Sequence, residues 1–320
     1  MTEDIYTIAS ALTGAPATEV VQASHGGNSR VYKVTAGGRT YALKQYPADR
    51  NRLDVERQAL ELMAKHNVVS VPEWYSAQAP YALMGWVEGA VIKEPKESDI
   101  AEAAVFLEAL HRLSKKTPAQ DMPLAAEACL SGQLIIDQLE KRLAALMPHA
   151  AENPALQQFL TQRFLPLYTS RFLAAKSMSG FADELPHADR TLIAADFGFH
   201  NIMRTPDGDL TFIDFEYFGW DDPVKLMSDF LLHPATPLTL AMKKNFHTHA
   251  VRIYGNGVQP RFAAFYPLFG LRWALILLNE FIPARWQARK AARGDGDWDT
   301  IKTEQIAKAE AMLTMSEKFE

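Results

Sequence analysis

Three polar residues that lie close together constrain this chain more than any other feature. Asp196 and Asn201 are five residues apart, and Asp214 follows between apolar residues in Ile-Asp-Phe-Glu, 213–216. The apolar segments 202–204 and 210–213 flank Thr-Pro-Asp-Gly-Asp, in which proline fixes φ and glycine permits a positive φ. We therefore expect a hairpin that brings Asn201 next to Asp214, although 13 residues separate them.

The chemistry of these three residues favours a metal–phosphate site. Each of them alone reads as an ordinary loop or strand-end residue. Together they supply oxygen ligands of the kind that Mg²⁺ takes from one or two carboxylates and from substrate phosphates. One aspartate remains to act on a hydroxyl group, so the set predicts phosphoryl transfer.

Length and charge narrow the class of protein. The 320 residues suffice for two lobes with separate cores. The net charge is −5 and no basic block occurs, so we expect no nucleic-acid partner. The N-terminus is acidic and has no apolar run, which argues against a signal peptide. The single cysteine, Cys129, excludes an intrachain disulfide and fits a cytoplasmic protein, where we expect it to be a small buried residue.

The most apolar segment, 262–281, predicts a buried helix. Pro267, Arg272, Asn279 and Glu280 interrupt it, which fits a membrane span poorly. We therefore expect no membrane partner, and the sequence says nothing about the oligomeric state.

The fold class predicted is α+β in two lobes. Residues 1–88 show strands near 19–22, 30–34, 39–44 and 81–84, separated by glycine turns, and one helix at 53–65; these features predict a small antiparallel sheet. Residues 89–320 predict a larger, mainly helical lobe. Ser98 is the expected N-cap of its first helix, which reaches residue 113. The other predicted helices span 131–147, 155–176, 223–232, 238–254, 261–281 and 297–317.

The N-terminal lobe carries the pattern of a nucleotide site. A glycine-containing loop lies between two strands, where bare N–H groups suit phosphate oxygens. Lys44 ends an apolar strand, and a charge there needs a partner, for which Glu56 on the next helix is preferred over Asp54. The segment between the lobes would present its backbone to an adenine edge. The predicted nucleotide-binding residues are Gly26, Gly27, Asn28, Ser29, Lys44, Glu56, Met84, Trp86 and Val87.

Asp196-Phe197-Gly198 spells the metal-binding tripeptide of protein kinases. The asparagine five residues after Asp196 marks this aspartate instead as the catalytic one, which leaves Asp214 to bind the metal. A protein kinase is disfavoured, because no Ala-Pro-Glu element follows Asp214 and little room remains for an activation segment.

These motifs resemble the aminoglycoside phosphotransferase and choline kinase superfamily. That family reads His-Gly-Asp, four residues, Asn, and then Ile-Asp-Trp/Phe-Glu. Its further elements are echoed here by the segments 107–111, 220–223 and 228–230. The resemblance implies a bilobal, protein-kinase-like kinase for a small molecule, with ATP and Mg²⁺ as cofactors. It implies that Asp196 acts on the acceptor hydroxyl, Asn201 and Asp214 hold Mg²⁺, and Lys44, positioned by Glu56, holds the phosphates.

The chain departs from this pattern in one place. Ala194 and Ala195 replace His-Gly before the catalytic aspartate. This departure motivates the alternative of a catalytically weak or inactive, nucleotide-binding, pseudokinase-like regulator.

The acceptor is expected to be a small molecule with a hydroxyl group: an amino alcohol, a sugar or an amino sugar. Acids and aromatics beyond the metal strand and on the C-terminal apolar helix suit a cationic acceptor, although core packing and a structural Asp-Pro turn explain much of this cluster. The candidates are Glu216, Tyr217, Trp220, Asp221, Arg272, Trp273 and Glu280. Five histidines without metal-ligand spacing are interpreted as surface, turn or packing residues: His25, His66, His187, His200 and His233.

Overall fold

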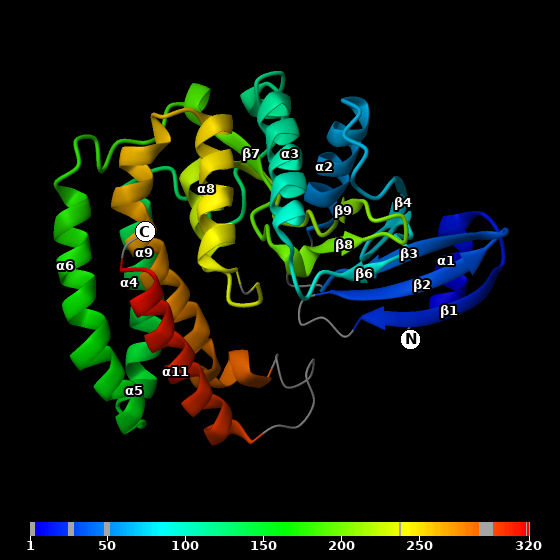
Figure 1. The fold of residues 1–320 in the computed structure, drawn as a ribbon. Helices are drawn as coiled ribbons and strands as arrows, with labels where there is room; N and C mark the ends of the chain where they lie inside the picture. Colours follow the sequence, from blue (N-terminus) through cyan, green and yellow to red (C-terminus); the bar gives the residue numbers. More distant parts are fainter. Residues whose placement is uncertain are drawn as a thin grey trace.

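The computed structural model describes residues 4–24, 29–47, 52–236, 238–287, 297–317 and 319. An antiparallel sheet forms the N-terminal part of the chain, and helices dominate the rest (Figure 1). The predicted α+β class, with a small sheet followed by a larger helical part, is confirmed. The boundary at residue 88 stays a prediction.

The N-terminal sheet has five strands in the order β1-β2-β3-β5-β4. All neighbouring pairs are antiparallel, as the glycine turns predict for β1–β2 and β2–β3. In this register Lys44 lies between Val31 and Ala82, near the end of β3. The strands are β1 (Ala17–Ser24), β2 (Arg30–Ala36), β3 (Arg39–Gln45), β4 (Trp74–Gln78) and β5 (Tyr81–Gly85).

Two helices accompany this sheet, so the expectation of a single helix is wrong. Helix α2 (Leu53–Lys65) has the predicted bounds. The additional helix, α1 (Ile5–Thr13), is capped by Asp4, whose side chain accepts a hydrogen bond from the Tyr6 N–H at 3.2 Å. It ends at Gly14, where φ is +69°. Both signals are present in the sequence.

The C-terminal helices match the predicted segments closely. The expected N-cap at Ser98 is wrong, because α3 begins at Glu97 and the Asp99 side chain accepts a hydrogen bond from the Lys96 N–H at 2.7 Å. The helices are α3 (Glu97–Ser114), α4 (Gly132–Ala150), α5 (Pro154–Phe159), the π-helical turn η3 (Leu160–Phe164), α6 (Leu165–Lys176), α7 (Pro223–Leu232), α8 (Leu240–Tyr254), α9 (Val258–Leu277) and α11 (Trp298–Met315). Short 3₁₀ turns are η2 (Ala119–Asp121), η4 (His187–Asp189), η5 (Phe199–Asn201) and η6 (Leu278–Phe281).

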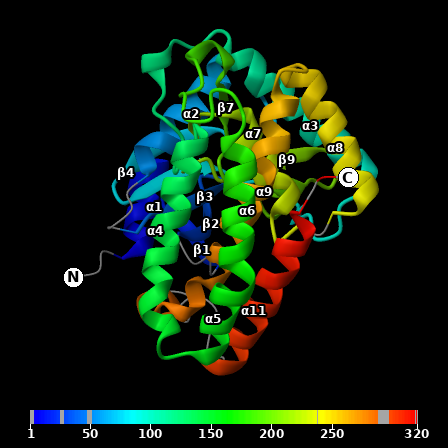
Figure 2. The same ribbon diagram turned by 90° about the vertical axis from the view of Figure 1, so that its left-hand side faces the viewer.

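Helix α9 is the central helix of the C-terminal part. The run Val258–Phe281 is long and apolar enough to cross a membrane, yet 67% of its apolar window is buried within the fold. It packs on α4, α6, α7 and α11. The prediction of a buried helix here is confirmed. Figures 1 and 2 show α4, α6 and α11 around it, on the side of the molecule away from β1 to β3.

Short strands lie between the sheet and the helices. β6 (Ala90–Val91), β8 (Ile202–Arg204) and β9 (Leu210–Phe212) form one small sheet, and β7 (Thr191–Ile193) pairs with β10 (Gly219–Asp221). Gly89 enters β6 with φ of +142°, and a Cβ there would lie 2.2 Å from the Arg204 carbonyl oxygen. Only glycine fits where the chain passes this closely over β8.

Candidate active site

The predicted hairpin places Asn201 beside Asp214. β8 and β9 pair with Ile202 opposite Phe212, and the Ile213 N–H donates to the Asn201 carbonyl oxygen at 3.0 Å. The connecting turn closes with the Gly208 N–H donating to the Thr205 carbonyl oxygen at 3.0 Å. The turn chemistry therefore sets the distance between the two candidate metal ligands.

Lys44 gathers three carboxylates from distant parts of the chain. Its Nζ lies 2.7 Å from Glu56 Oε2, 2.7 Å from Asp214 Oδ1 and 3.3 Å from Glu216 Oε2. The lysine and Glu56 come from the N-terminal part, and the other two acids follow β9. Lys44 and Glu56 are 4% and 2% exposed, so their contact is largely shielded from water, whereas the Asp214 side chain is 35% exposed.

The carboxylates decide the charge of Lys44. Burial lowers the pKa of this amine, but the nearby charges of Glu56 and Asp214 outweigh that effect and hold the pKa above its ordinary value. Burial raises the pKa of Glu56, against the opposing effect of Lys44. The two charges therefore stabilise each other, because burial disfavours each of them and the opposite charge of the partner favours it.

Glu56 also joins the two parts of the protein. Its Oε1 accepts a hydrogen bond from the Phe215 backbone N–H at 3.0 Å, and its Oε2 accepts a short one from the Tyr46 hydroxyl. The neighbouring Asp214 has a φ of +68°, a conformation that few residues other than glycine adopt. Such strain often occurs at functional sites, and here it accompanies the carboxylate that reaches Lys44.

Asp196 is held on the adjacent loop. The Asn201 amide donates to its carbonyl oxygen at 3.0 Å and to Oδ2 at 3.4 Å, which leaves the Asn201 amide oxygen for a cation. His200 Nε2 lies 3.3 Å from Asp196 Oδ1, and His233 Nε2 lies 3.7 Å from the same oxygen. Burial raises the pKa of Asp196, but the His200 hydrogen bond and the imidazoles outweigh it, so the pKa is lowered. Asp196 is ionised near neutral pH.

His200 and His233 are the site residues that sequence reasoning missed. Their rings stack at 4.1 Å with planes 6° apart, directly on the candidate catalytic carboxylate. His200 lies in a turn and the two rings pack on each other, as two of the predicted alternatives have it, but their ring nitrogens and the Asp196 carboxylate also lie within 4.8 Å of one another. A signal existed for His200, since it precedes Asn201 in the same turn. None existed for His233, because α7 brings it there.

The predicted acceptor residues are distributed over several environments. Tyr217 lies under the Arg52 guanidinium, Trp220 and Asp221 are buried in β10, and Glu280 is 1% exposed. Trp273 meets the His233 ring edge-on at 4.9 Å, and His233 Nε2 in turn lies 3.7 Å from Asp196.

Arg272 and Glu216 sit elsewhere. Arg272 is buried in ion pairs with Asp229 at 3.2 Å and Glu127 at 2.7 Å. Glu216 lies with Lys44, and its Oε2 accepts a hydrogen bond from the Ser29 hydroxyl at 3.1 Å.

The remaining nucleotide candidates lie along the sheet or outside the described residues. Gly26, Gly27 and Asn28 belong to the second group. Met84 is buried in β5 opposite Ala42, Trp86 stacks beneath the Lys33 ammonium at 4.9 Å, and Val87 follows before the chain enters β6.

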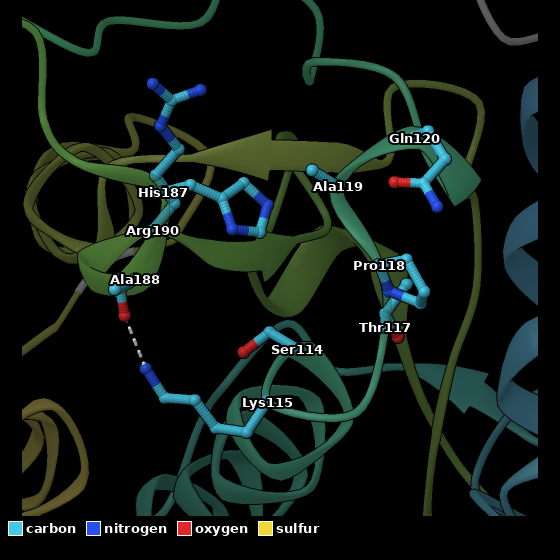
Figure 3. A pocket seen from close by; sticks show the side chains of 9 residues that line it. All are labelled: Ser114, Lys115, Thr117, Pro118, Ala119, Gln120, His187, Ala188 and Arg190. Atoms are coloured by element: carbon cyan, nitrogen blue, oxygen red, sulfur yellow. Dashed lines mark hydrogen bonds between the residues drawn. The ribbon is translucent and has the colours of Figure 1, made fainter.

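A cavity of about 620 Å³ lies apart from these clusters. Its wall comes from the end of α3 and from η2 and η4 (Figure 3). The Lys115 ammonium donates to the Ala188 carbonyl oxygen at 2.8 Å, and Arg190 pairs with Glu184 at 2.7 Å, so both cations have partners. The lining residues are Ser114, Lys115, Thr117, Pro118, Ala119, Gln120, His187, Ala188 and Arg190.

Comparison with known proteins agrees with the geometry. Residues 19–225 match the model of the phosphotransferase enzyme family. The chain belongs to this family. The protein is accordingly a phosphotransferase with an alcohol group as acceptor. No curated protein matches the sequence significantly.

Solved structures share the fold at low identity. The streptomycin–ATP complex of APH(2″)-IIa is 14% identical to this chain, with 98% of each chain covered and a TM-score of 0.59. Choline kinase LicA from Streptococcus pneumoniae is 17% identical over 97% of each chain, with a TM-score of 0.60. Ethanolamine kinase from Plasmodium vivax is 16% identical, covers 93% of this chain and 81% of its own, and has a TM-score of 0.57. These similarities show the protein-kinase-like fold.

Proposed function

We propose that this protein is a Mg²⁺-dependent kinase that transfers the γ-phosphate of ATP to a hydroxyl group of a small molecule. The observation that carries the proposal is the meeting of Lys44, Glu56 and Asp214 beside the Asp196–Asn201 loop. Two of the similar structures support this proposal: one is a complex with ATP and streptomycin, and the other is a choline kinase. They favour nucleotide use and a small acceptor. A cytoplasmic location, where ATP is abundant, belongs to the same proposal.

The acidic cluster fits a divalent cation. Glu56, Asp214 and Glu216 bring carboxylate oxygens within 4.8 Å of one another, against the single positive charge of Lys44. Asn201 and Asp214 would hold Mg²⁺, and the position of Glu216 makes it a third candidate on the nucleotide side. When bound, Mg²⁺ would neutralise charge on the transferring phosphates.

Asp196 has the properties of the group that receives the acceptor proton. Its carboxylate is ionised, held by Asn201, and partly accessible to solvent. The acceptor oxygen forms a bond to the γ-phosphorus, the bond from that phosphorus to ADP breaks, and the hydroxyl proton passes to Asp196. Lys44 stabilises the phosphates, so most of the catalysis is alignment and charge stabilisation.

For the acceptor we propose an amino alcohol, a sugar or an amino sugar. Trp273 is the proposed contact, since it packs edge-on against the His233 ring, whose Nε2 lies 3.7 Å from Asp196. Its indole offers an aromatic face to an ammonium group or to a sugar ring.

The test is Mg²⁺-dependent ATP consumption with a panel of amino alcohols, amino sugars, neutral sugars and aminoglycosides. Asp196→Asn should abolish turnover, and Asp207→Asn, an exposed acid in the β8–β9 turn, should not. Clear Mg-ATP binding without turnover on any class would favour the pseudokinase-like alternative raised by Ala194 and Ala195.

The assignment of the two aspartates has its own test. Asp214→Asn should weaken Mg-ATP binding in calorimetry, because Asp214 contacts Lys44, whereas Asp196→Asn should leave it nearly unchanged. The reverse result would exchange the two assignments.

A further inference from the structure

The two histidines on Asp196 have no part in the chemistry proposed above. They come from different segments: His200 belongs to η5, and His233 caps the C-terminal end of α7. Both present Nε2 to the same oxygen of Asp196, at 3.3 and 3.7 Å. Two stacked rings that converge on one carboxylate oxygen form a specific arrangement, and it calls for a physical account.

Backbone contacts fix the proton of His233. The Ala235 N–H donates to His233 Nδ1 at 3.2 Å, so Nδ1 carries a lone pair. Burial lowers the pKa of His233 to about 4, which keeps the ring neutral near pH 7. A neutral imidazole with a lone pair on Nδ1 carries its proton on Nε2. That N–H faces Asp196 beyond direct hydrogen-bond distance and acts on the carboxylate as an oriented dipole.

This protonation state argues against a metal site. Asp196, His200 and His233 have the composition of a two-histidine, one-carboxylate metal site. Metal binding through His233 Nε2 would need the proton on Nδ1, where the Ala235 N–H already donates. The cluster therefore presents a donor to Asp196.

The His233 ring is held from behind by a buried network. Trp273 packs edge-on against it at 4.9 Å, with planes 83° apart. The Trp273 indole N–H donates to Asp229 Oδ1 at 2.8 Å. Asp229 is fixed in turn by Lys225 at 3.1 Å and by Arg272 at 3.2 Å. Asp229, Lys225 and Arg272 are each less than 7% exposed, so the ring rests on a rigid support.

We propose that His233 is a positioning residue, whose Nε2–H orients the Asp196 carboxylate toward the acceptor hydroxyl while Trp273 fixes the ring. This inference rests on the proposed function of Asp196. It also provides an anchor for the catalytic loop of a chain that carries Ala194 and Ala195 before Asp196.

Two substitutions separate the donor from the packing. In His233→Gln, the side-chain amide places an N–H near the position of Nε2. In His233→Asn, the side-chain oxygen replaces Nδ1 as the acceptor for Ala235, but no donor reaches Asp196. The assay uses Mg-ATP with water as the acceptor, so no sugar or amino alcohol need be known. We expect kcat to fall about 3- to 10-fold in His233→Asn, less than for loss of a direct hydrogen bond to a charged group because Nε2 lies 3.7 Å from Asp196, and to be largely restored in His233→Gln. KM for ATP should stay unchanged in both.

A merely structural role would produce a different pattern. It would lower kcat to the same extent in both variants, or it would raise KM for ATP. A kcat in His233→Asn that matches the wild type would also overturn the proposal. ¹⁵N NMR of the histidine rings in the wild-type protein is the second measurement. A proton on Nε2 of His233 at pH 7 is expected, and a proton on Nδ1 would overturn the proposal even if both variants failed to fold.

The same assay distinguishes failure of the proposed function. If Asp196→Asn hydrolysed Mg-ATP as fast as wild type, the role of Asp196 would fall. If Asp196→Asn were inactive and His233→Asn fully active, the result would contradict only the positioning role of His233.

Discussion

Replacement of Glu56 by glutamine tests whether one buried carboxylate holds the two parts of the site together. Glu56 accepts hydrogen bonds from Lys44, Tyr46 and the Phe215 N–H. Glutamine has a single acceptor oxygen and a donating NH₂ group, so it can accept either from Lys44 and Tyr46 or from the Phe215 N–H, but not from both. Whichever way the amide turns, a donor will face either Lys44 or the Phe215 N–H.

The magnitude follows from what remains after the change. Removal of one partner from a buried ion pair typically costs about 3–5 kcal/mol. Lys44 keeps Asp214 at 2.7 Å and Glu216 at 3.3 Å, and a neutral amide is easier to bury than a carboxylate. Both effects place the expected loss near the lower limit, at about 3 kcal/mol of local stability.

Hydrogen exchange followed by mass spectrometry measures this loss where it occurs. A decrease of about 3 kcal/mol speeds exchange of the β3 and α2 amides roughly a hundredfold, provided they exchange through local opening. Glu61→Gln is the matched control on the same helix, since Glu61 pairs with Arg57 at 3.1 Å on the surface and should contribute at most about 1 kcal/mol.

Equal exchange in Glu56→Gln and Glu61→Gln would refute the reasoning. A second comparison examines the ion pair itself. Lys44→Met leaves Glu56, Asp214 and Glu216 close together without their cation. Adding Glu56→Gln to Lys44→Met should therefore cost less than Glu56→Gln costs alone, or even stabilise the protein.

Three further outcomes are expected. Gly89→Ala places a Cβ 2.2 Å from the Arg204 carbonyl oxygen and should lower the free energy of unfolding by about 2–4 kcal/mol in urea titrations. Gly208→Ala, with open space around it, should lower it by only about 1 kcal/mol, and equal losses would contradict the steric argument. Because the pKa of His233 is about 4 when folded and 6.5 ordinarily, the unfolded chain binds the extra proton between these values. This contribution to the free energy of unfolding should thus be complete above pH 6.5 and decline toward pH 4, by up to about 1.4 kcal/mol per pH unit. His233→Gln should remove this decline, and an unchanged decline in the variant would argue against the buried neutral ring. Chelation of Mg²⁺ should weaken ATP binding about tenfold or more in calorimetry, and unaltered affinity would count against the metal site.

Local chemistry explains which features the sequence predicts well. The β8–β9 hairpin follows from one proline–glycine turn between two apolar segments, and α2 follows from the spacing of Leu53, Leu60 and Met63. The contact of Lys44 with Glu56 is predictable because an unpaired charge at the end of an apolar strand is costly. Each of these conclusions depends on residues fewer than 15 positions apart.

Other features depend on tertiary structure. Among the described residues β4 pairs with β5 alone, and its side chains are half-buried or exposed, so it lacks the alternating apolar pattern of a strand. β7 and β10 have three residues each, which is too short for a periodic signal. His233 lies 37 residues beyond Asp196 and reaches it because of the direction of α7. The sequence predicts Glu216 as an acceptor residue, although it and Asp214 flank the buried Phe215 at i and i+2 and therefore share one side of the chain.

The two halves of the candidate site are held by different parts of the protein. The Lys44 cluster consists of Lys44, Glu56, Asp214 and Glu216. Its contacts link the N-terminal part of the chain to the segment after β9, through Asp214 and the Phe215 N–H. Asp196, in contrast, is held within the C-terminal part, by Asn201 and the histidine pair. A shift of the sheet relative to the helices would therefore loosen the nucleotide side and leave Asp196 in place. It follows that variants at the Lys44 cluster should act mainly on KM for ATP, whereas variants around Asp196 should act mainly on kcat.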